Sequence, residues 1–255
     1  MKPSTITKPK RKLRLWAVLV WLAVWWAASL AIGHEILLPS PGATLSRLAA
    51  LAVTAPFWRA VGFSVARILA GFLLALTAGA LCAALASFSR PVRELLEPPM
   101  LVMKSTPVAS FIILCLIWIP SRNLSVFTGF LLVFPIVYTN LLEGIRNTDP
   151  AMLEMAGLFG VSRYKRARYI YLSQVIPYLR SACAVSLGFC WKAGIAAEVI
   201  GIPSGSIGES LYESKLYIDI PSLFAWTVVI ILASVLFERV FLRLLGAALG
   251  RLERM

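Results

Sequence analysis

The apolar residues of this chain are gathered in six long blocks, at positions 15–36, 61–86, 101–119, 126–142, 179–200 and 223–245. Each block approaches the roughly 20 residues that an α-helix needs to cross a lipid bilayer. Within the blocks, apolar residues follow one another without the regular polar face of a half-buried helix. The pattern predicts an all-α integral membrane protein with about six transmembrane helices.

Composition supports this prediction and changes the meaning of the charge. Hydrophobic residues make up 59% of the 255 positions and charged residues only 15%, with a net charge of +13. In a soluble protein such a charge would suggest nucleic acid, whereas in a membrane protein it follows from retention of basic loops on the cytoplasmic side. We therefore expect a lipid bilayer around the chain and no nucleic-acid partner. The first block exceeds the roughly 7–15 apolar residues of a signal peptide, so we interpret it as a retained helix.

The basic residues alternate from one side of the predicted membrane to the other. With the N-terminus inside, the cytoplasmic segments collect most of the lysines and arginines, and the outer segments collect only Arg47, Arg59, Arg122 and Lys215. This asymmetry predicts that both termini are cytoplasmic. The chain then divides into a basic tail (1–14), a first helix with an outer loop (15–59), a core (60–246) and a C-terminal tail (247–255).

The loop at 149–177, between the fourth and fifth blocks, has strong local signals. Asp149 suits a helix N-cap and Pro150 the first helical position, while Gly160 suits a left-handed C-terminal cap and Ser162 a second N-cap. Apolar residues share one face of the first helix, at Ala151, Met152, Met155, Leu158 and Phe159. We expect two short helices joined by a tight turn. Docking of a partner protein on the apolar face is favoured over packing against the chain's own bundle.

Polar residues inside the apolar blocks are the second set of candidates. Lys192 either lines a pathway together with Trp191 or pairs with a carbonyl or carboxylate of another helix. For Glu198, six positions further on, a structural role is favoured over substrate contact. Pro107 predicts a kink or a break lined by water in the third helix.

No residue pattern predicts catalysis or a metal site on this chain. It has one histidine, no paired buried carboxylates and no nucleophile with an adjacent base. A Gly-x4-Gly-Lys-Ser/Thr sequence is also absent, so any ATP must be hydrolysed by another chain. We expect a protein that is not itself an enzyme and carries no cofactor.

The same loop resembles the EAA loop of ABC importer permeases. The similar positions are Glu154-Met155-Ala156, Gly160 and Ile170-Tyr171-Leu172, with Met155 in place of an alanine and Ser173 in place of a proline. Over about 61–245 the chain also resembles the nitrate/sulfonate/taurine-type subfamily, through Arg67 with Gly71, Lys104-Ser-Thr-Pro107, Phe134-Pro135, Trp191 with Ala197-Glu198, and Ser206-Ile-Gly208.

The resemblance implies the type I importer fold and a permease of the bacterial plasma (inner) membrane. It implies a second permease copy, cytoplasmic ATPase subunits that hold ATP and magnesium, and an external substrate-binding protein. The substrate would be nitrate, a sulfonate, taurine or a vitamin precursor. The implied coupling residues are Glu154, Met155, Ala156, Gly160, Ile170 and Leu172, and the pathway candidates are Pro107, Trp191, Lys192 and Glu198. The alternative is a secondary transporter or channel that works alone.

Overall fold

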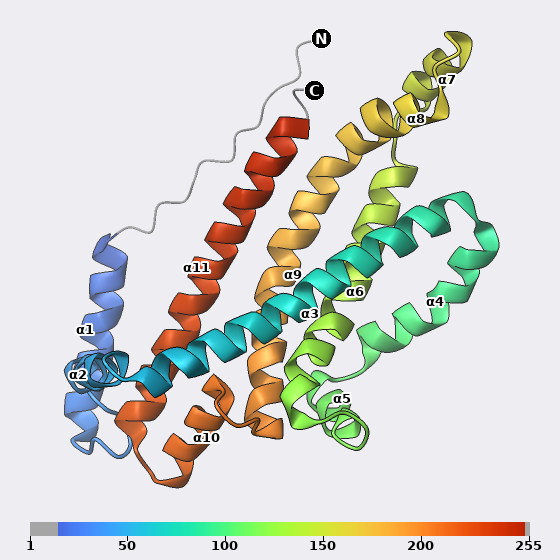
Figure 1. Ribbon diagram of the computed structural model, residues 1–255. Helices are drawn as coiled ribbons and strands as arrows, with labels where there is room; N and C mark the ends of the chain where they lie inside the picture. Colours follow the sequence, from blue (N-terminus) through green and yellow to red (C-terminus); the bar gives the residue numbers. More distant parts are fainter. Residues whose placement is uncertain (1–14, 253–255) are drawn as a thin grey trace.

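A computed structural model describes residues 15–252, all of whose regular structure is helical (Figure 1). The predicted tail at 1–14 lies outside the described residues. The elements are α1 (Leu15–Ile32), α2 (Pro41–Ala52), α3 (Ala55–Phe88), α4 (Arg90–Ser105), α5 (Val108–Cys115), α6 (Ser121–Arg146), α7 (Pro150–Leu158), α8 (Arg163–Arg166), the π-helical turn η1 (Ala167–Tyr171), α9 (Leu172–Gly201), α10 (Ile207–Leu216) and α11 (Ile220–Leu252).

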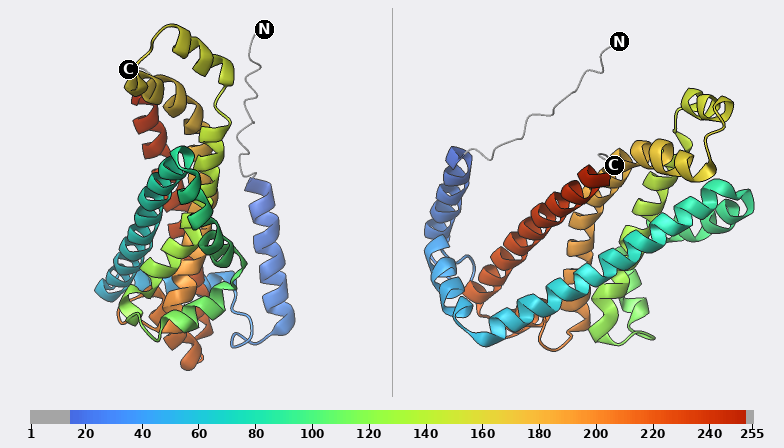
Figure 2. Two further views of the ribbon diagram at one scale, coloured as in Figure 1. Left: turned by 90° about the vertical axis from the view of Figure 1, so that its right-hand side faces the viewer. Right: turned by 45° about the horizontal axis from the view of Figure 1, so that its top comes forward.

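The long apolar helices form a bundle in which α6 packs between α3 and α9 (Figures 1 and 2). Close van der Waals packing of side chains holds helices together in lipid, and the core of this bundle includes Ile68, Phe72, Val137, Leu187 and Trp191. The loop with α7 and α8 extends from one end of the bundle, and α10 lies at the other. These are named here the α7 end and the α10 end.

Within the described range, four helical segments are long and apolar enough to cross a membrane: α3, α6, α11 and the continuous helix Arg163–Gly201. The pair α4 and α5 forms a fifth candidate, bent by 105° at its break. The apolar helix Trp16–Ile32 is shorter than these. All six predicted blocks therefore fall on helices, while the number that cross the membrane stays a prediction.

The third block differs most from its prediction. The helix begins at Arg90, eleven residues before the predicted block. The sequence missed this start because the first turns of α4 are amphipathic and carry charged residues, which a hydropathy pattern excludes. It ends at Ser105, and α5 restarts at Val108 after the predicted break. Thr106 is extended (ψ 128°), as expected for a residue that precedes a proline, because the Pro107 ring clashes with a helical neighbour. Pro98 and Pro99 lie inside α4 without ending it.

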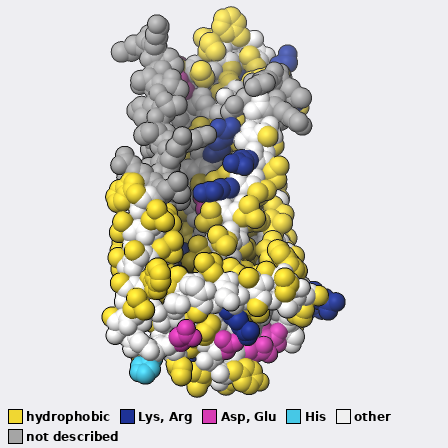
Figure 3. All heavy atoms as spheres, turned by 90° about the vertical axis from the view of Figure 1, so that its left-hand side faces the viewer, with side chains coloured by type: hydrophobic (Ala, Val, Ile, Leu, Met, Phe, Trp, Pro, Cys, Tyr) yellow, Lys and Arg dark blue, Asp and Glu magenta, His cyan; other side chains and the backbone are white. Residues whose placement is uncertain are grey.

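The α10 end gathers most of the acidic side chains of the face shown in Figure 3, together with His34. Arg47 of α2 pairs there with Asp219, which precedes α11, across 2.7 Å. Ser222 also donates a hydrogen bond to Asp219 (2.7 Å). Burial raises the pKa of the Asp219 carboxyl, but the bonds from Ser222 and Arg47 outweigh it and hold this pKa below its ordinary value.

Candidate functional site

The segment Pro150–Leu158 forms the helix expected for the first part of the loop. Asp149 caps it by accepting a hydrogen bond from the Ala151 amide (2.9 Å), and Pro150 occupies the first turn, where its missing N–H costs nothing. Gly160 has the predicted left-handed conformation (φ +62°), which reverses the chain. Ser162 caps the next helix by accepting from the Lys165 amide (3.4 Å).

The second part of the loop differs from the prediction of a separate short helix. Ser162 does begin a helix, but α8 passes through the π-helical turn η1 directly into α9. Arg163–Gly201 is consequently one helix of 39 residues. Ser173, which stands where the resembling loop has a proline, keeps its backbone N–H available in this continuous stretch.

The side chain of Arg166 holds the turn between α7 and α8 closed. Its Nε donates to the Val161 carbonyl (2.9 Å) and its Nη2 donates to the Ala156 carbonyl (3.1 Å). Ala156 lies in the last turn of α7, where carbonyls have no partner within the helix and the helix dipole favours a positive charge. Arg166 thus acts within the loop, a role that the sequence pattern did not indicate.

Two side chains of α9 attach the loop to the bundle. Gln174 accepts a hydrogen bond from the Asp149 amide through Oε1 (2.9 Å) and directs its Nε2 toward the Met152 sulfur (3.2 Å). The Tyr178 hydroxyl accepts from the Asn147 side chain (3.2 Å). These contacts fix where α7 begins and leave its tip to project from the bundle.

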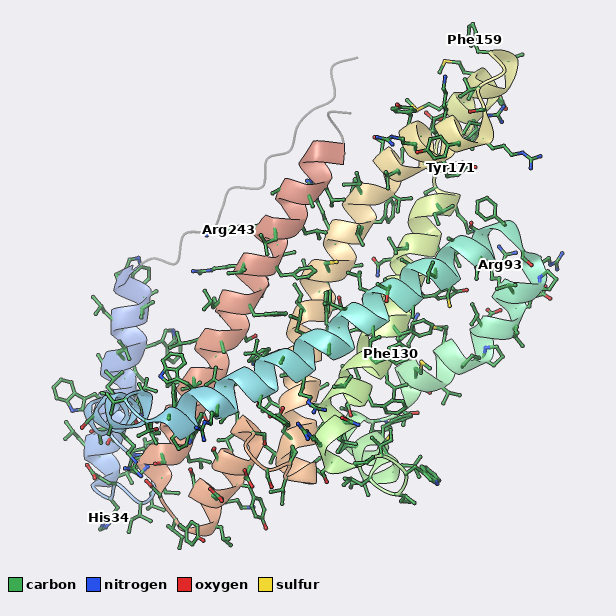
Figure 4. All side chains as sticks on the ribbon, in the orientation of Figure 1. His34, Arg93, Phe130, Phe159, Tyr171 and Arg243 are labelled. Atoms are coloured by element: carbon green, nitrogen blue, oxygen red, sulfur yellow. The ribbon has the colours of Figure 1, made fainter. Side chains whose placement is uncertain are left out.

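The apolar face of α7 is exposed in this chain. Leu158 and Phe159 are 88% and 80% exposed, and Met152 and Met155 are about half exposed. Figure 4 shows Phe159 at the tip of the loop, pointing away from the bundle. Exposed apolar side chains on an ordered, well-attached helix are typical of a protein interface.

The remaining loop candidates divide by burial. Ala156 is buried, whereas Ile170 and Leu172 are half-buried along the continuous helix. Glu154 is exposed, and no hydrogen bond joins it to the described residues. The structure thus brings Met155, Glu154 and Gly160 to the projecting part of the loop.

The four pathway candidates do not share one surface. Trp191 is buried and donates through Nε1 to the Ile230 carbonyl (3.1 Å), while Glu198 is only 1% exposed. Lys192 and Pro107 are exposed in this chain. Within the described residues, neither a carboxylate nor a carbonyl of another helix pairs with Lys192, so the alternative of a paired charge finds no partner there.

Glu198 joins three elements at the α10 end. Its Oε2 accepts hydrogen bonds from the Ser64 hydroxyl (2.6 Å) and the Gly208 amide (3.4 Å). Ser64 in turn accepts from the Ile207 amide (3.0 Å), so α3 and α9 together satisfy free N–H groups in the first turn of α10. A Cβ on Gly208 would overlap the main chain of Glu198, which shows how closely α10 approaches α9. Ser64 was missed in the sequence because it lies 134 positions from Glu198.

The bundle with a broken span and a projecting helical loop defines a membrane transporter subunit, and comparison with known proteins identifies its family. Residues 71–251 match the family described as "Binding-protein-dependent transport system inner membrane component". The chain belongs to this family and is the permease component of an ABC importer in a bacterial membrane. Family membership supports this function over a transporter or channel that works alone.

Two curated relatives and one solved structure illustrate the similarity. The chain is 25% identical over 200 residues to the taurine transport system permease protein TauC of Escherichia coli, covering 76% of this chain and 73% of TauC. It is 22% identical over 206 residues to the nitrate import permease protein NrtB of Synechococcus elongatus, with coverage of 76% and 73%. A bacterial alginate ABC transporter crystallised with its periplasmic protein shares the fold, with a TM-score of 0.60, 13% identity and coverage of 94% and 95%.

Proposed function

We propose that α7 is the docking element for a separate ATPase subunit and that the α7 end faces the cytoplasm. The observation that carries this proposal is the exposed apolar face of α7 on a loop held by Arg166 and Gln174. An ordered apolar helix fits a groove in a partner through contacts at helical spacing. ATP and magnesium are then bound by the partner.

The second part of the proposal is a pathway between two copies of this chain. Lys192 is exposed on α9 although Trp191 and Ala193 beside it are buried, so it lies on a face that this chain leaves uncovered. A second copy would cover this face and enclose a pathway, with Lys192 and Pro107 on its wall. A cation at this depth favours an anionic substrate.

The substrate and its delivery follow from the relatives' chemistry. Taurine, for which TauC is named, carries a negatively charged oxyanion group, and nitrate, for which NrtB is named, is itself an oxyanion. We propose a small oxyanion of this kind, delivered by an external binding protein to the α10 end in the bacterial plasma membrane.

Co-purification of the ATPase with the full-length permease tests the docking role of α7. Glu154→Lys, which reverses a charge on the projecting helix, and Gly160→Val, which forces a β-branched residue into a left-handed conformation, should both reduce ATPase association and uptake at least tenfold, a loss of about 1.4 kcal/mol in binding. Gly160→Asn is the matched control, because asparagine tolerates this conformation and the site has open space around it.

The amount of each variant in the membrane should stay unchanged, because positions 154 and 160 are both exposed. Unaltered association and uptake after residues 150–160 are scrambled would rule out this function for α7.

A further inference from the structure

A groove between α4 and α6, separate from the α7 loop, has a composition that membrane helices rarely expose. It has a volume of about 490 Å³ and is lined by Arg93, Glu97, Met100, Leu101, Lys104, Tyr138, Thr139, Leu142 and Arg146. Three of these side chains are cationic and one is anionic. In the described residues, none of the three cations forms an ion pair within this chain.

The groove runs from the α7 end into the bundle. Arg93 lies in the first turns of α4, near the corner with α3, and Arg146 ends α6 (Figure 4). Lys104 is eleven residues beyond Arg93, which places it about 16 Å deeper along α4 at 1.5 Å per residue. It lies in the last turn before the break at Thr106 and Pro107. Cations therefore occupy both the mouth and the inner part of the groove.

A second hollow extends the groove toward the α7 end. It has a volume of about 320 Å³, shares Thr139, Leu142 and Arg146 with the first, and adds Glu143 and Asn147. Asn147 begins the chain segment that leads into α7, so the groove and this hollow together reach that segment. A ligand in the groove would consequently have a way out on the side where the ATPase is proposed to dock.

The hydroxyl of Tyr138 is the second, independent observation. Its side chain lines the groove and is only 4% exposed, yet no hydrogen bond joins it to the described residues. The hydroxyl oxygen itself is not fully buried, so it opens into the groove, where it can donate a hydrogen bond to a ligand. Thr139 Oγ1 donates to the Pro135 carbonyl (2.7 Å) and is thereby fixed on the groove wall.

From this geometry we infer that the α4–α6 groove binds a small oxyanion, such as a sulfonate, between Arg93, Lys104 and the Tyr138 hydroxyl. A charge-assisted hydrogen bond from one cation together with one O–H matches the acceptor oxygens of such a group, and the other cation adds electrostatic attraction along the groove. The apolar floor at Met100 and Leu101 accommodates a short carbon chain. Glu97 reduces the positive charge and keeps the binding weak enough for release.

This inference rests on the proposed function, because it names the substrate class on the route to the α7 end. Its test uses the full-length chain in phosphatidylcholine nanodiscs, with acetylation of lysines by acetic anhydride measured by peptide mass spectrometry. Methanesulfonate should slow acetylation of Lys104 in proportion to 1 + [L]/Kd, about threefold at twice the dissociation constant. Chloride at the same ionic strength should not.

Lys165 and Lys215 are internal controls, because both are exposed and neither lines the groove or the hollow that extends it. Tyr138→Phe, which removes one hydroxyl, and Arg93→Gln should each reduce the protection of Lys104 without changing acetylation of the two control lysines. Arg163→Gln on exposed α8 is the matched charge control and should leave the protection intact.

Two results would overturn the inference. If chloride and methanesulfonate protected Lys104 equally, charge screening rather than binding would explain the protection. Protection that occurs only in nanodiscs with phosphatidylglycerol would make the groove a lipid headgroup site. Because the measurement requires neither ATPase nor transport, either result would leave the docking role of α7 standing.

Discussion

Ser64 donates a 2.6 Å hydrogen bond to Glu198, across 134 positions of sequence, and through it α3 and α9 hold the first turn of α10. Ser64→Ala would leave the Ile207 amide and one acceptor site of Glu198 without this partner. The expected loss of stability is about 1–3 kcal/mol, from desolvated groups left unpaired. Thermal unfolding of the purified protein measures it. Ser87→Ala is the control on the same helix, because within residues 15–252 the Ser87 hydroxyl bonds only to the Ala84 carbonyl of α3 itself. An equal effect of both variants would contradict this account.

Gly208→Ala tests the close approach of α10 to α9. The added Cβ would lie 2.6 Å from the Val199 amide nitrogen, so α10 must shift. Overpacking of this kind costs about 1–3 kcal/mol, and we expect the upper part of that range because the obstruction is main chain. Gly62→Ala on α3 meets no atom within 4 Å and should leave the unfolding temperature unchanged or slightly raise it. If Gly208→Ala left the unfolding temperature unchanged, α10 would not pack against α9 as described.

Arg166→Gln should loosen α7 without unfolding the bundle. Losing two hydrogen bonds from a charged group, to the Val161 and Ala156 carbonyls, should cost the loop about 1–2 kcal/mol. Amide hydrogen exchange in residues 150–160 should then become about tenfold faster, while exchange in α6 stays the same. Lys165→Gln removes an adjacent exposed charge and provides the control. Exchange that responds equally to both variants would indicate a general charge effect.

The pair of Arg47 and Asp219 makes stability at the α10 end dependent on pH. Because the pKa of Asp219 is lowered in the folded chain, its ionised form stabilises the fold above its ordinary pKa of about 4, and this contribution disappears as the pH falls through the lowered value. Both side chains are a third or more exposed, so the contribution should stay below about 1 kcal/mol.

Asp219→Asn should accordingly lower the unfolding temperature near neutral pH, and this deficit should shrink as the pH falls through the lowered pKa and the native carboxyl also becomes protonated. Glu213→Gln removes another exposed carboxylate of the α10 end, from α10 itself, and should not change the unfolding temperature at any of these pH values. A deficit of Asp219→Asn that persists at low pH would assign the effect to shape rather than charge.

The parts of the fold that the sequence predicted are those with local causes. Asp149, Gly160 and Ser162 each act within a few residues, and all three have the predicted conformations or bonds. Apolar blocks revealed the helices because lipid requires long apolar stretches. The start of α4 at Arg90 was missed because a charged, amphipathic turn carries no hydropathy signal.

The parts that could not be predicted depend on distant residues meeting. The contacts of Ser64 with Glu198 and the groove between Arg93 and Tyr138 exist only once α3, α4, α6 and α9 are packed. The role of Arg166 was missed for a different reason. Basic residues are expected in any loop predicted to be cytoplasmic, so the sequence offered no reason to assign Arg166 a further role. Only its distances to two carbonyls reveal a role in the turn.

The uninterrupted helix Arg163–Gly201 has a mechanical consequence. Its 39 residues span about 58 Å at 1.5 Å per residue and connect the projecting loop to the membrane without a break, with the π-helical turn η1 and Pro177 as the places where the helix can bend. The other connection of the loop, at 147–149, is not helical, and the hydrogen bonds of Asn147 and Asp149 tie it to α9 as well. A push on α7 would therefore pass into α9 through both connections and move this helix by a tilt, twist or bend, and Glu198 near its far end holds α10.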